Sequence, residues 1–124
     1  MKYKELTNEI INAAYAIHNS LGFGFLEKIY QNALIIELRK RGIEVEPEKP
    51  IKVFYNGQVV GDYVADIVVE NKVTLELRAV KKLQEIHEVQ LVNYLKATGI
   101  EVGLLMNFGP SVNVKRKVFD RVDC

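Results

Sequence analysis

ADIVVENKVTLELRAVKK, residues 65–82, decides the fold, because two apolar runs of β type flank the polar turn Glu70–Lys72. Such runs on either side of a short polar turn predict a hairpin, with strands over Tyr63–Val69 and Val73–Ala79. Two features set this hairpin apart. An aspartate, Asp66, interrupts the first apolar run, and a glutamate and an arginine lie two positions apart in the second strand.

The second strand has an apolar and a polar face, because side chains in a strand alternate between its two faces. The apolar side chains are Val73, Leu75, Leu77 and Ala79, and the polar ones are Thr74, Glu76 and Arg78. Half-buried strands commonly alternate in this way, with the apolar face in the core and the polar face in water. Taken alone, this strand therefore favours an ordinary structural role over a catalytic one.

Asp66 is harder to explain as a structural residue. Aspartate is disfavoured in strands, and its burial between Ala65 and Ile67 is costly without a partner. Pairing about the turn can place Asp66 near Glu76, where the two carboxylates repel each other. A bound Mg²⁺ ion is the simplest compensation, because it needs few protein carboxylates and keeps waters and phosphate oxygens as its other ligands. Such an ion can generate a hydroxide and neutralise charge that develops on a phosphate.

The rest of the chain predicts an α/β fold. Apolar residues at helical spacing predict helices over 7–21, 26–41 and 83–98. Asn56-Gly57 is a strong signal for a hairpin turn. Further strands are expected over 51–55, 58–60, 101–109 and 112–119. The apolar run after the third helix predicts a β–α–β crossover with parallel pairing, so the expected core is a central mixed sheet flanked by helices.

Length and composition limit the class of protein. The chain has 124 residues, enough for a single domain over 1–124 but too few for two independent ones. With 48% hydrophobic residues, 27% charged residues and a net charge of +1, it is expected to fold as a globule and to hold any anionic partner by local charge. It has no apolar run that could cross a membrane and no signal sequence, and Cys124 is its only cysteine. We therefore expect a cytoplasmic protein without internal disulfides or cysteine-based zinc sites.

Two of the expected helices carry polar residues that could reach the hairpin. In the third helix, His87, Gln90 and Tyr94 lie within a sector of about 100° on a largely apolar face, which suggests polar surroundings inside the protein. Each is also compatible with a satisfied core group, and for His87 this is the better interpretation. Glu27 lies in the first turn of the second helix, where the helix dipole favours an acidic residue in any case.

Taken together, these residues resemble a known family. GFLEKIY, residues 24–30, matches the pattern for which the GxxExxY protein family is named, and the resemblance continues through ADIVVENKVTLELRAV, IHEVQLVNYLKATG and VGLLMNFG. That family is similar to a compact branch of the PD-(D/E)xK nuclease superfamily. The resemblance implies a restriction-endonuclease-like core, a Mg²⁺ or Mn²⁺ site on the central hairpin, and nucleic acid as the partner.

The resemblance also implies roles for individual residues. Asp66 takes the place of the first motif aspartate, with Ala65 where the motif has proline, and Glu76 takes the (D/E) place. The backbone carbonyl of Leu77 corresponds to the further metal ligand that is usual in such sites. Glu27 corresponds to a helix glutamate that joins or approaches the metal.

The remaining motif positions include one departure. Gln90 and Tyr94 match the Q-x-x-x-Y signature of RecB-like members, placed to bind the substrate backbone or to brace the site, but Arg78 stands where the pattern has lysine. Arginine binds phosphate well, yet it cannot readily release a proton because its pKa stays above about 12. If the motif lysine acts as a general base, this chain is nearly inactive, whereas an electrostatic role leaves some activity. Lys81 and Lys82, beyond the strand end, could supply a migrated amine.

Three functions remain open from the sequence, ranked in the following order. The first is a metal-dependent nuclease, in which Asp66 and Glu76 hold the metal and Arg78 meets the scissile phosphate. The second is a catalytically inactive nuclease-fold module that binds nucleic acid or a protein partner. The basic runs Arg39–Arg41 and Lys115–Lys117 could contact phosphates, although such short runs are more often solvated surface. The third is a protein–protein interaction domain or homodimer that does not touch nucleic acid.

Overall fold

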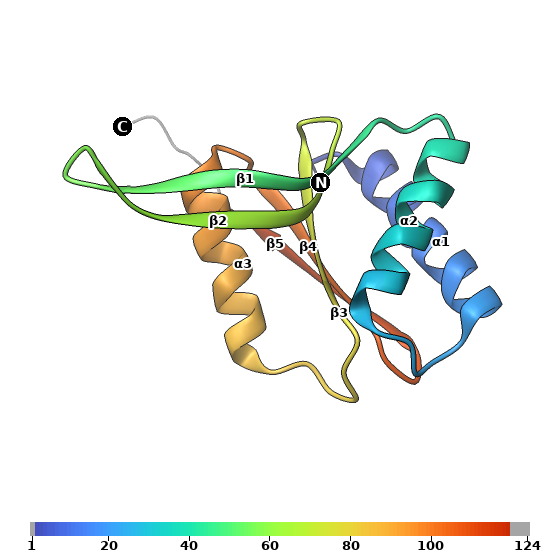
Figure 1. Cartoon of the computed structure of the whole chain (residues 1–124). Helices are drawn as coiled ribbons and strands as arrows, with labels where there is room; N and C mark the ends of the chain where they lie inside the picture. Colours follow the sequence, from blue (N-terminus) through green and yellow to red (C-terminus); the bar gives the residue numbers. More distant parts are fainter. Residues whose placement is uncertain (1, 120–124) are drawn as a thin grey trace.

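The computed structural model describes residues 2–119, and within them it contains three helices and five strands (Figure 1). The helices are α1 (Lys4–Leu21), α2 (Glu27–Lys40) and α3 (Glu85–Thr98). The strands are β1 (Val45–Tyr55), β2 (Gln58–Val69), β3 (Val73–Arg78), β4 (Val102–Phe108) and β5 (Val112–Val118). Residues 1 and 120–124 of the expected domain, with Cys124, lie outside the described residues. Among the helices of the described part, none has the length and apolar character needed to cross a bilayer.

The strands form one mixed sheet in the order β1-β2-β3-β4-β5. Three of the strand pairs are antiparallel: β1 with β2, β2 with β3, and β4 with β5. β3 and β4 pair in parallel and are connected through α3, which confirms the predicted β–α–β crossover. The expected α/β class with a central mixed sheet is therefore confirmed.

The hairpin of β1 and β2 is longer than the sequence predicts. Asn56 and Gly57 have φ angles of 50° and 75°, as a two-residue hairpin turn requires, so the predicted turn is confirmed. The predicted break between residues 60 and 63 is wrong, because Gly61 pairs with Val53 and β2 continues through it as one strand. β1 also begins earlier than predicted in spite of two prolines, which its position at the edge of the sheet permits.

Helices cover both faces of the sheet (Figure 1). α1 and α2 lie together over the larger core, which includes Ile10, Ile17, Tyr30, Leu34, Leu38, Leu75 and Leu104. α3 covers the opposite face, where Leu91 approaches β4 so closely that a Cβ on Gly103 would lie 2.8 Å from its Cδ1. The glycine at 103 therefore allows the third helix to pack onto the sheet.

β3 is buried on both faces, which corrects the interpretation of its alternating sequence. The side chain of Thr74 is fully buried, and Glu76 is only 4% exposed. The face that the alternation assigned to water is instead covered within the fold. A buried glutamate in a central strand requires partners, and its surroundings define the candidate site.

Candidate active site

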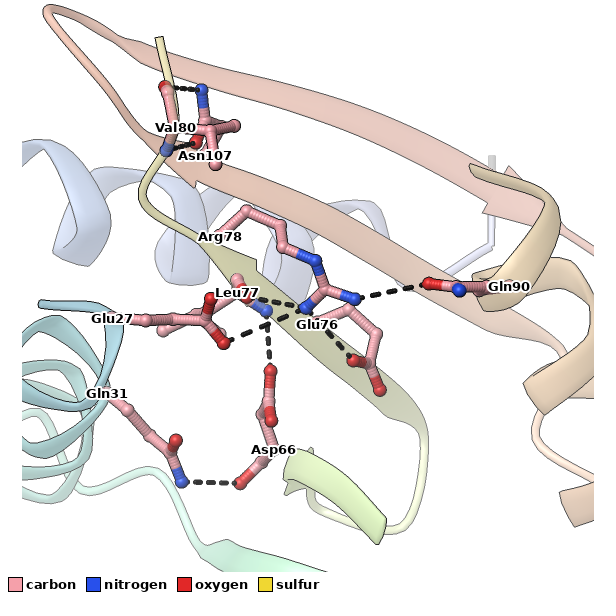
Figure 2. Close-up of polar contacts among 9 residues, drawn as sticks. All are labelled: Glu27, Gln31, Asp66, Glu76, Leu77, Arg78, Val80, Gln90 and Asn107. Atoms are coloured by element: carbon pink, nitrogen blue, oxygen red, sulfur yellow. Dashed lines mark hydrogen bonds and ion pairs between the residues drawn. The ribbon is translucent and has the colours of Figure 1, made fainter. Parts of the chain in front are cut away.

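β2 and β3 diverge where the two motif carboxylates lie. The strands pair only between residues 67–69 and 73–75. Beyond these pairs, Asp66 extends its carboxylate toward β3, and its Oδ2 accepts a hydrogen bond of 2.8 Å from the Leu77 amide (Figure 2). The divergence therefore leaves room for a side chain of β2 to reach the backbone of β3 next to Glu76.

Burial favours the protonated form of both hairpin carboxyl groups, and the charge of Asp66 adds to this effect at Glu76. Burial, and after it the charge of Asp66, raise the pKa of Glu76 to about 8, although the charge of Arg78 opposes this shift. Burial also raises the pKa of Asp66, while the Leu77 amide and Arg78 lower it. Within the described part of the chain, Oε1 of Glu76 is buried and has no hydrogen-bond partner. A cation between these groups would stabilise both in their charged form.

The G-x-x-E-x-x-Y pattern positions a third acidic side chain. Gly24 has a φ of 114°, a conformation that favours glycine, in the loop before α2. Tyr30 fixes this loop, because its buried hydroxyl donates to the Gly22 carbonyl at 2.5 Å and accepts from the Phe25 amide at 3.3 Å. Glu27 is then the first residue of α2 and points toward β3 (Figure 2), and burial raises its pKa.

Arg78 lies among these acidic groups (Figure 2). Its Nη1 donates to the Leu77 carbonyl at 2.8 Å and lies 3.8 Å from a carboxylate oxygen of Glu27 and of Glu76. Its Nη2 donates to the side-chain oxygen of Gln90 at 3.3 Å. The guanidinium thus contacts the carbonyl and two of the carboxylates that the family resemblance places at the metal. A cation of the chain itself balances part of the acidic charge.

A second cation, which the sequence did not single out, also acts on the site. Lys28 lies at the start of α2, pairs with Glu48, and lowers the pKa of Asp66 through its charge. Among the described residues, the cations that shift the pKa of Asp66 are Arg78 and Lys28. An amine that acts on Asp66 therefore comes from α2.

The two residues of the Q-x-x-x-Y pattern have different surroundings. Gln90 is exposed and bonds the Arg78 guanidinium, whereas Tyr94 is buried. The Tyr94 ring lies 4.8 Å from that of Tyr63, and its hydroxyl has no hydrogen-bond partner within residues 2–119. Burial, followed by the charge of Glu76, raises the pKa of Tyr63 to about 12. Sequence reasoning missed Tyr63, whose only local signal is an aromatic ring three positions before the motif aspartate.

Gln31 is another site residue that sequence reasoning missed. It lies one turn after Glu27 on α2, is 5% exposed, and donates from Nε2 to the backbone carbonyl of Asp66 at 3.1 Å (Figure 2). This bond ties the position of Asp66 on β2 to the helix that carries Glu27. A glutamine within the buried face of a helix is the sequence signal that could have identified it.

The oxygen atoms at this site fit a hard divalent cation. Mg²⁺ and Mn²⁺ prefer carboxylate and carbonyl oxygens, and Asp66, Glu76 and Leu77 offer both kinds. Within residues 2–119, however, no three acidic, histidine or cysteine side chains converge closely enough to hold a metal by themselves. An ion would therefore combine two carboxylates with the Leu77 carbonyl and with ligands from outside the chain, and it would compete with Arg78 for that carbonyl.

Known proteins share both the sequence pattern and the fold. A family model described as the PD-(D/E)XK nuclease superfamily matches residues 4–120. A solved structure titled "Crystal structure of SSO0001" has the same fold, with a TM-score of 0.59 and 22% sequence identity over 98% of this chain and 62% of that one. No curated protein matches the chain. The family match covers nearly the whole chain, and the mixed sheet between helices agrees with the restriction-endonuclease-like core that the sequence predicts. The chain belongs to the PD-(D/E)XK nuclease superfamily.

Proposed function

We propose that this protein hydrolyses phosphodiester bonds of nucleic acid with Mg²⁺ or Mn²⁺. The observation that supports the proposal is the convergence of Asp66, Glu76 and the Leu77 carbonyl, with Glu27 beside them at the start of α2 (Figure 2). Buried carboxyl groups with raised pKa values are costly in a structural strand and are typical of functional sites. Nucleases of this superfamily typically use divalent metals, and a metal-dependent site accounts for the buried Glu76 beside the half-buried Asp66.

Each residue of the site has a separate task in this proposal. Asp66, held by the Leu77 amide, and Glu76 would bind the ion together with the Leu77 carbonyl. When bound, the ion would supply an activated water and neutralise charge on the phosphate. Arg78 would turn its guanidinium from the Leu77 carbonyl to the scissile phosphate, and Gln90 would hold its Nη2 during this exchange.

The test compares cleavage by the wild type and by variants of Asp66. Labelled single- and double-stranded DNA and RNA are incubated with Mg²⁺, Mn²⁺ or EDTA. Asp66→Asn keeps a hydrogen-bond acceptor for the Leu77 amide but removes the charge, so the fold is retained while metal binding is lost. We expect a rate loss of at least about 100-fold, because even a misplacement of about 1 Å at a reacting centre can cost that much.

Asp62→Asn is the matched control, because Asp62 is an exposed aspartate on the same strand. It should cleave at the wild-type rate. Metal-dependent cleavage that persists unchanged in Asp66→Asn would show that the nuclease activity does not come from this site.

A second candidate function is supported by the position of Arg78. Its Nη1 donates to the Leu77 carbonyl and lies near two of the carboxylates. These contacts favour a nuclease-fold module that binds nucleic acid without cutting it. Under this alternative, binding weakens steeply with salt and no metal produces cleavage. Cleavage by the wild type that disappears in Asp66→Asn rejects it.

A further inference from the structure

Three lysines line a cleft beyond the end of β3. Lys81 and Lys82 come from the segment that follows β3, and Lys115 comes from β5. Ser111 and Asn113 add neutral polar groups to the lining, and the volume of the cleft is about 350 Å³. We call this feature the lysine cleft. It joins cations that lie more than thirty residues apart in the sequence.

The charges of the cleft lysines are not paired with acidic side chains in the described part of the chain. Lys81, Lys82 and Lys115 are exposed, and none of them forms an ion pair within the described part of the chain. Glu88 also borders the cleft, but Lys117 pairs with it at 2.6 Å, and the charge of Lys115 acts on it more weakly. The cleft therefore presents three like charges with their main acidic neighbour already neutralised.

Two arginines of the basic runs Arg39–Arg41 and Lys115–Lys117 are engaged within the protein. Arg41 contacts Glu37 at 2.8 Å and Glu9 at 3.2 Å. Arg116 donates to the Lys2 carbonyl at 2.5 Å. These arginines hold helices and the N-terminal segment in place, so they have less charge to offer a ligand than the cleft lysines.

The cleft is fixed in position relative to Glu27, Asp66 and Glu76, which we call the acidic cluster. The buried Asn107 side chain accepts from the Val80 amide at 3.0 Å and donates to the Val80 carbonyl at 2.8 Å (Figure 2). Gly109 permits this approach, because a Cβ there would lie 2.6 Å from the Val80 carbonyl oxygen. Lys81 follows immediately and lies three residues after Arg78, a chain distance of at most about 10 Å.

We propose that the lysine cleft binds backbone phosphates of the nucleic-acid strand whose scissile bond lies at the acidic cluster. This inference rests on the proposed function, because it takes that strand to be the substrate of the cluster. Lysine ammonium groups bind phosphate as point charges and do not read bases, so the cleft positions the strand without selecting a sequence. The strand then leaves the site over the end of β3 toward β5.

An extended strand fits the cleft better than a single phosphate does. The lysines are exposed, and exposed charges are screened by salt, so one small anion gains little from them. A nucleic-acid backbone contacts several lysines at once and releases the counterions that surround it, which makes binding both stronger and strongly dependent on salt.

The test measures binding without cleavage. The affinity of a short fluorescent oligonucleotide is measured in EDTA by anisotropy over a series of salt concentrations. The cleft variant changes three exposed lysines to glutamine: Lys81, Lys82 and Lys115. The control variant makes the same change in net charge at exposed lysines outside the cleft: Lys4, Lys40 and Lys52.

We expect the cleft variant to reduce the slope of log affinity against log salt by roughly two to three in total, and to bind at least about tenfold more weakly at low salt. The control variant should keep most of the wild-type slope. Equal losses in both variants would overturn the proposal, because they would show that net charge alone matters. Inorganic phosphate that binds the wild type as tightly as the oligonucleotide does would also overturn it.

The outcomes for the cleft and for hydrolysis are separable. If the cleft variant alone loses affinity but no preparation cleaves nucleic acid, the proposed hydrolysis fails, and the cleft stands as a phosphate-binding surface without a substrate strand. If the wild type cleaves and the cleft variant binds and cleaves equally well, the cleft proposal fails and the hydrolysis stands.

Discussion

At the scale of a single residue, Arg78 bears on the proposed chemistry, because it stands where the family resemblance implies a lysine. Its guanidinium donates in several directions at once, whereas a lysine amine is a compact charge on a flexible stem. In this chain the guanidinium holds the Leu77 carbonyl, lies between Glu27 and Glu76, and reaches Gln90. In the proposed mechanism a metal ion would need the Leu77 carbonyl and the carboxylates, and the phosphate would need the guanidinium itself. Arg78 would therefore compete with the ion for its ligands and would bind the phosphate once it is displaced.

Arg78→Lys is predicted to tighten Mn²⁺ binding and to increase metal-dependent cleavage, each by about tenfold. Lysine ends in one compact amine without the planar fork of arginine, so we expect it to hold the Leu77 carbonyl less firmly and to compete less with the ion. Calorimetric Mn²⁺ titration and a cleavage assay measure the two effects. Arg39→Lys, at an exposed position on α2, is the control. Weaker Mn²⁺ binding in Arg78→Lys would mean that arginine assists the ion.

Without divalent metal, the folded protein is predicted to lose stability as the pH rises from about 4.5 to about 8. The pKa of Glu76 is raised from 4.5 to about 8 in the fold, so its neutral form is favoured there. The stability that Glu76 contributes is fully present at pH values below its pKa in the unfolded chain. It is lost as the pH rises through its pKa in the folded protein. Since one pKa unit corresponds to about 1.4 kcal/mol, the loss is on the order of a few kcal/mol.

Urea denaturation in EDTA across this pH range measures the effect. Glu76→Gln should flatten the pH dependence, whereas Glu44→Gln, at an exposed glutamate, should retain it. A stability that rises over the same range would show that Glu76 is stabilised as a charged group.

Local sequence identifies some site residues and leaves others hidden. An aspartate within an apolar strand is unusual in its immediate neighbourhood, so Asp66 stands out without any knowledge of the fold. Tyr63 reaches the site by packing on Tyr94, and Gln31 reaches it by bonding the Asp66 carbonyl. These contacts join separate helices and strands, so neither spacing nor periodicity along the chain reveals them.

Among the elements, β3 shows that a strand can be predicted correctly while the burial of one of its faces is predicted wrongly. Its residues alternate between apolar and polar as in a half-exposed strand, yet Thr74 and Glu76 are buried. Whether a second layer covers a strand depends on packing by a distant segment, which the pattern of the strand does not contain. The turn at Asn56-Gly57 was predictable because its two positive φ angles are a local requirement.

One side chain of β4 is predicted to hold in place the segment that links β3 to the lysine cleft. Asn107→Ala removes both hydrogen bonds to Val80 and leaves those polar groups without their partner. We expect a loss of about 1–3 kcal/mol in the free energy of unfolding, measured by chemical denaturation.

Asn113→Ala is the matched control, because Asn113 is the exposed residue that pairs with Asn107 on β5. It should change stability by less than about 0.5 kcal/mol. Equal effects of the two substitutions would show that the bonds to Val80 do not stabilise the fold.

At the scale of the whole molecule, the candidate site requires both helical layers. Asp66 and Glu76 come from neighbouring strands, Glu27 comes from α2, and Gln90 comes from α3 on the opposite face of the sheet (Figures 1 and 2). The sequence predicted the class of fold because periodicity, turns and the crossover are local signals. The balance of cations and carboxylates at the centre depends on side-chain positions, so membership in the superfamily does not settle the chemistry.

A crystal structure of the wild type soaked in Mn²⁺ tests the central claim most directly, because the ion can be located by its anomalous scattering. We predict a peak bound by the carboxylates of Asp66 and Glu76 and by the Leu77 carbonyl, with Arg78 moved off that carbonyl. If saturating Mn²⁺ gives no peak there and the Arg78 Nη1 still donates to the Leu77 carbonyl, the hairpin is not a metal site.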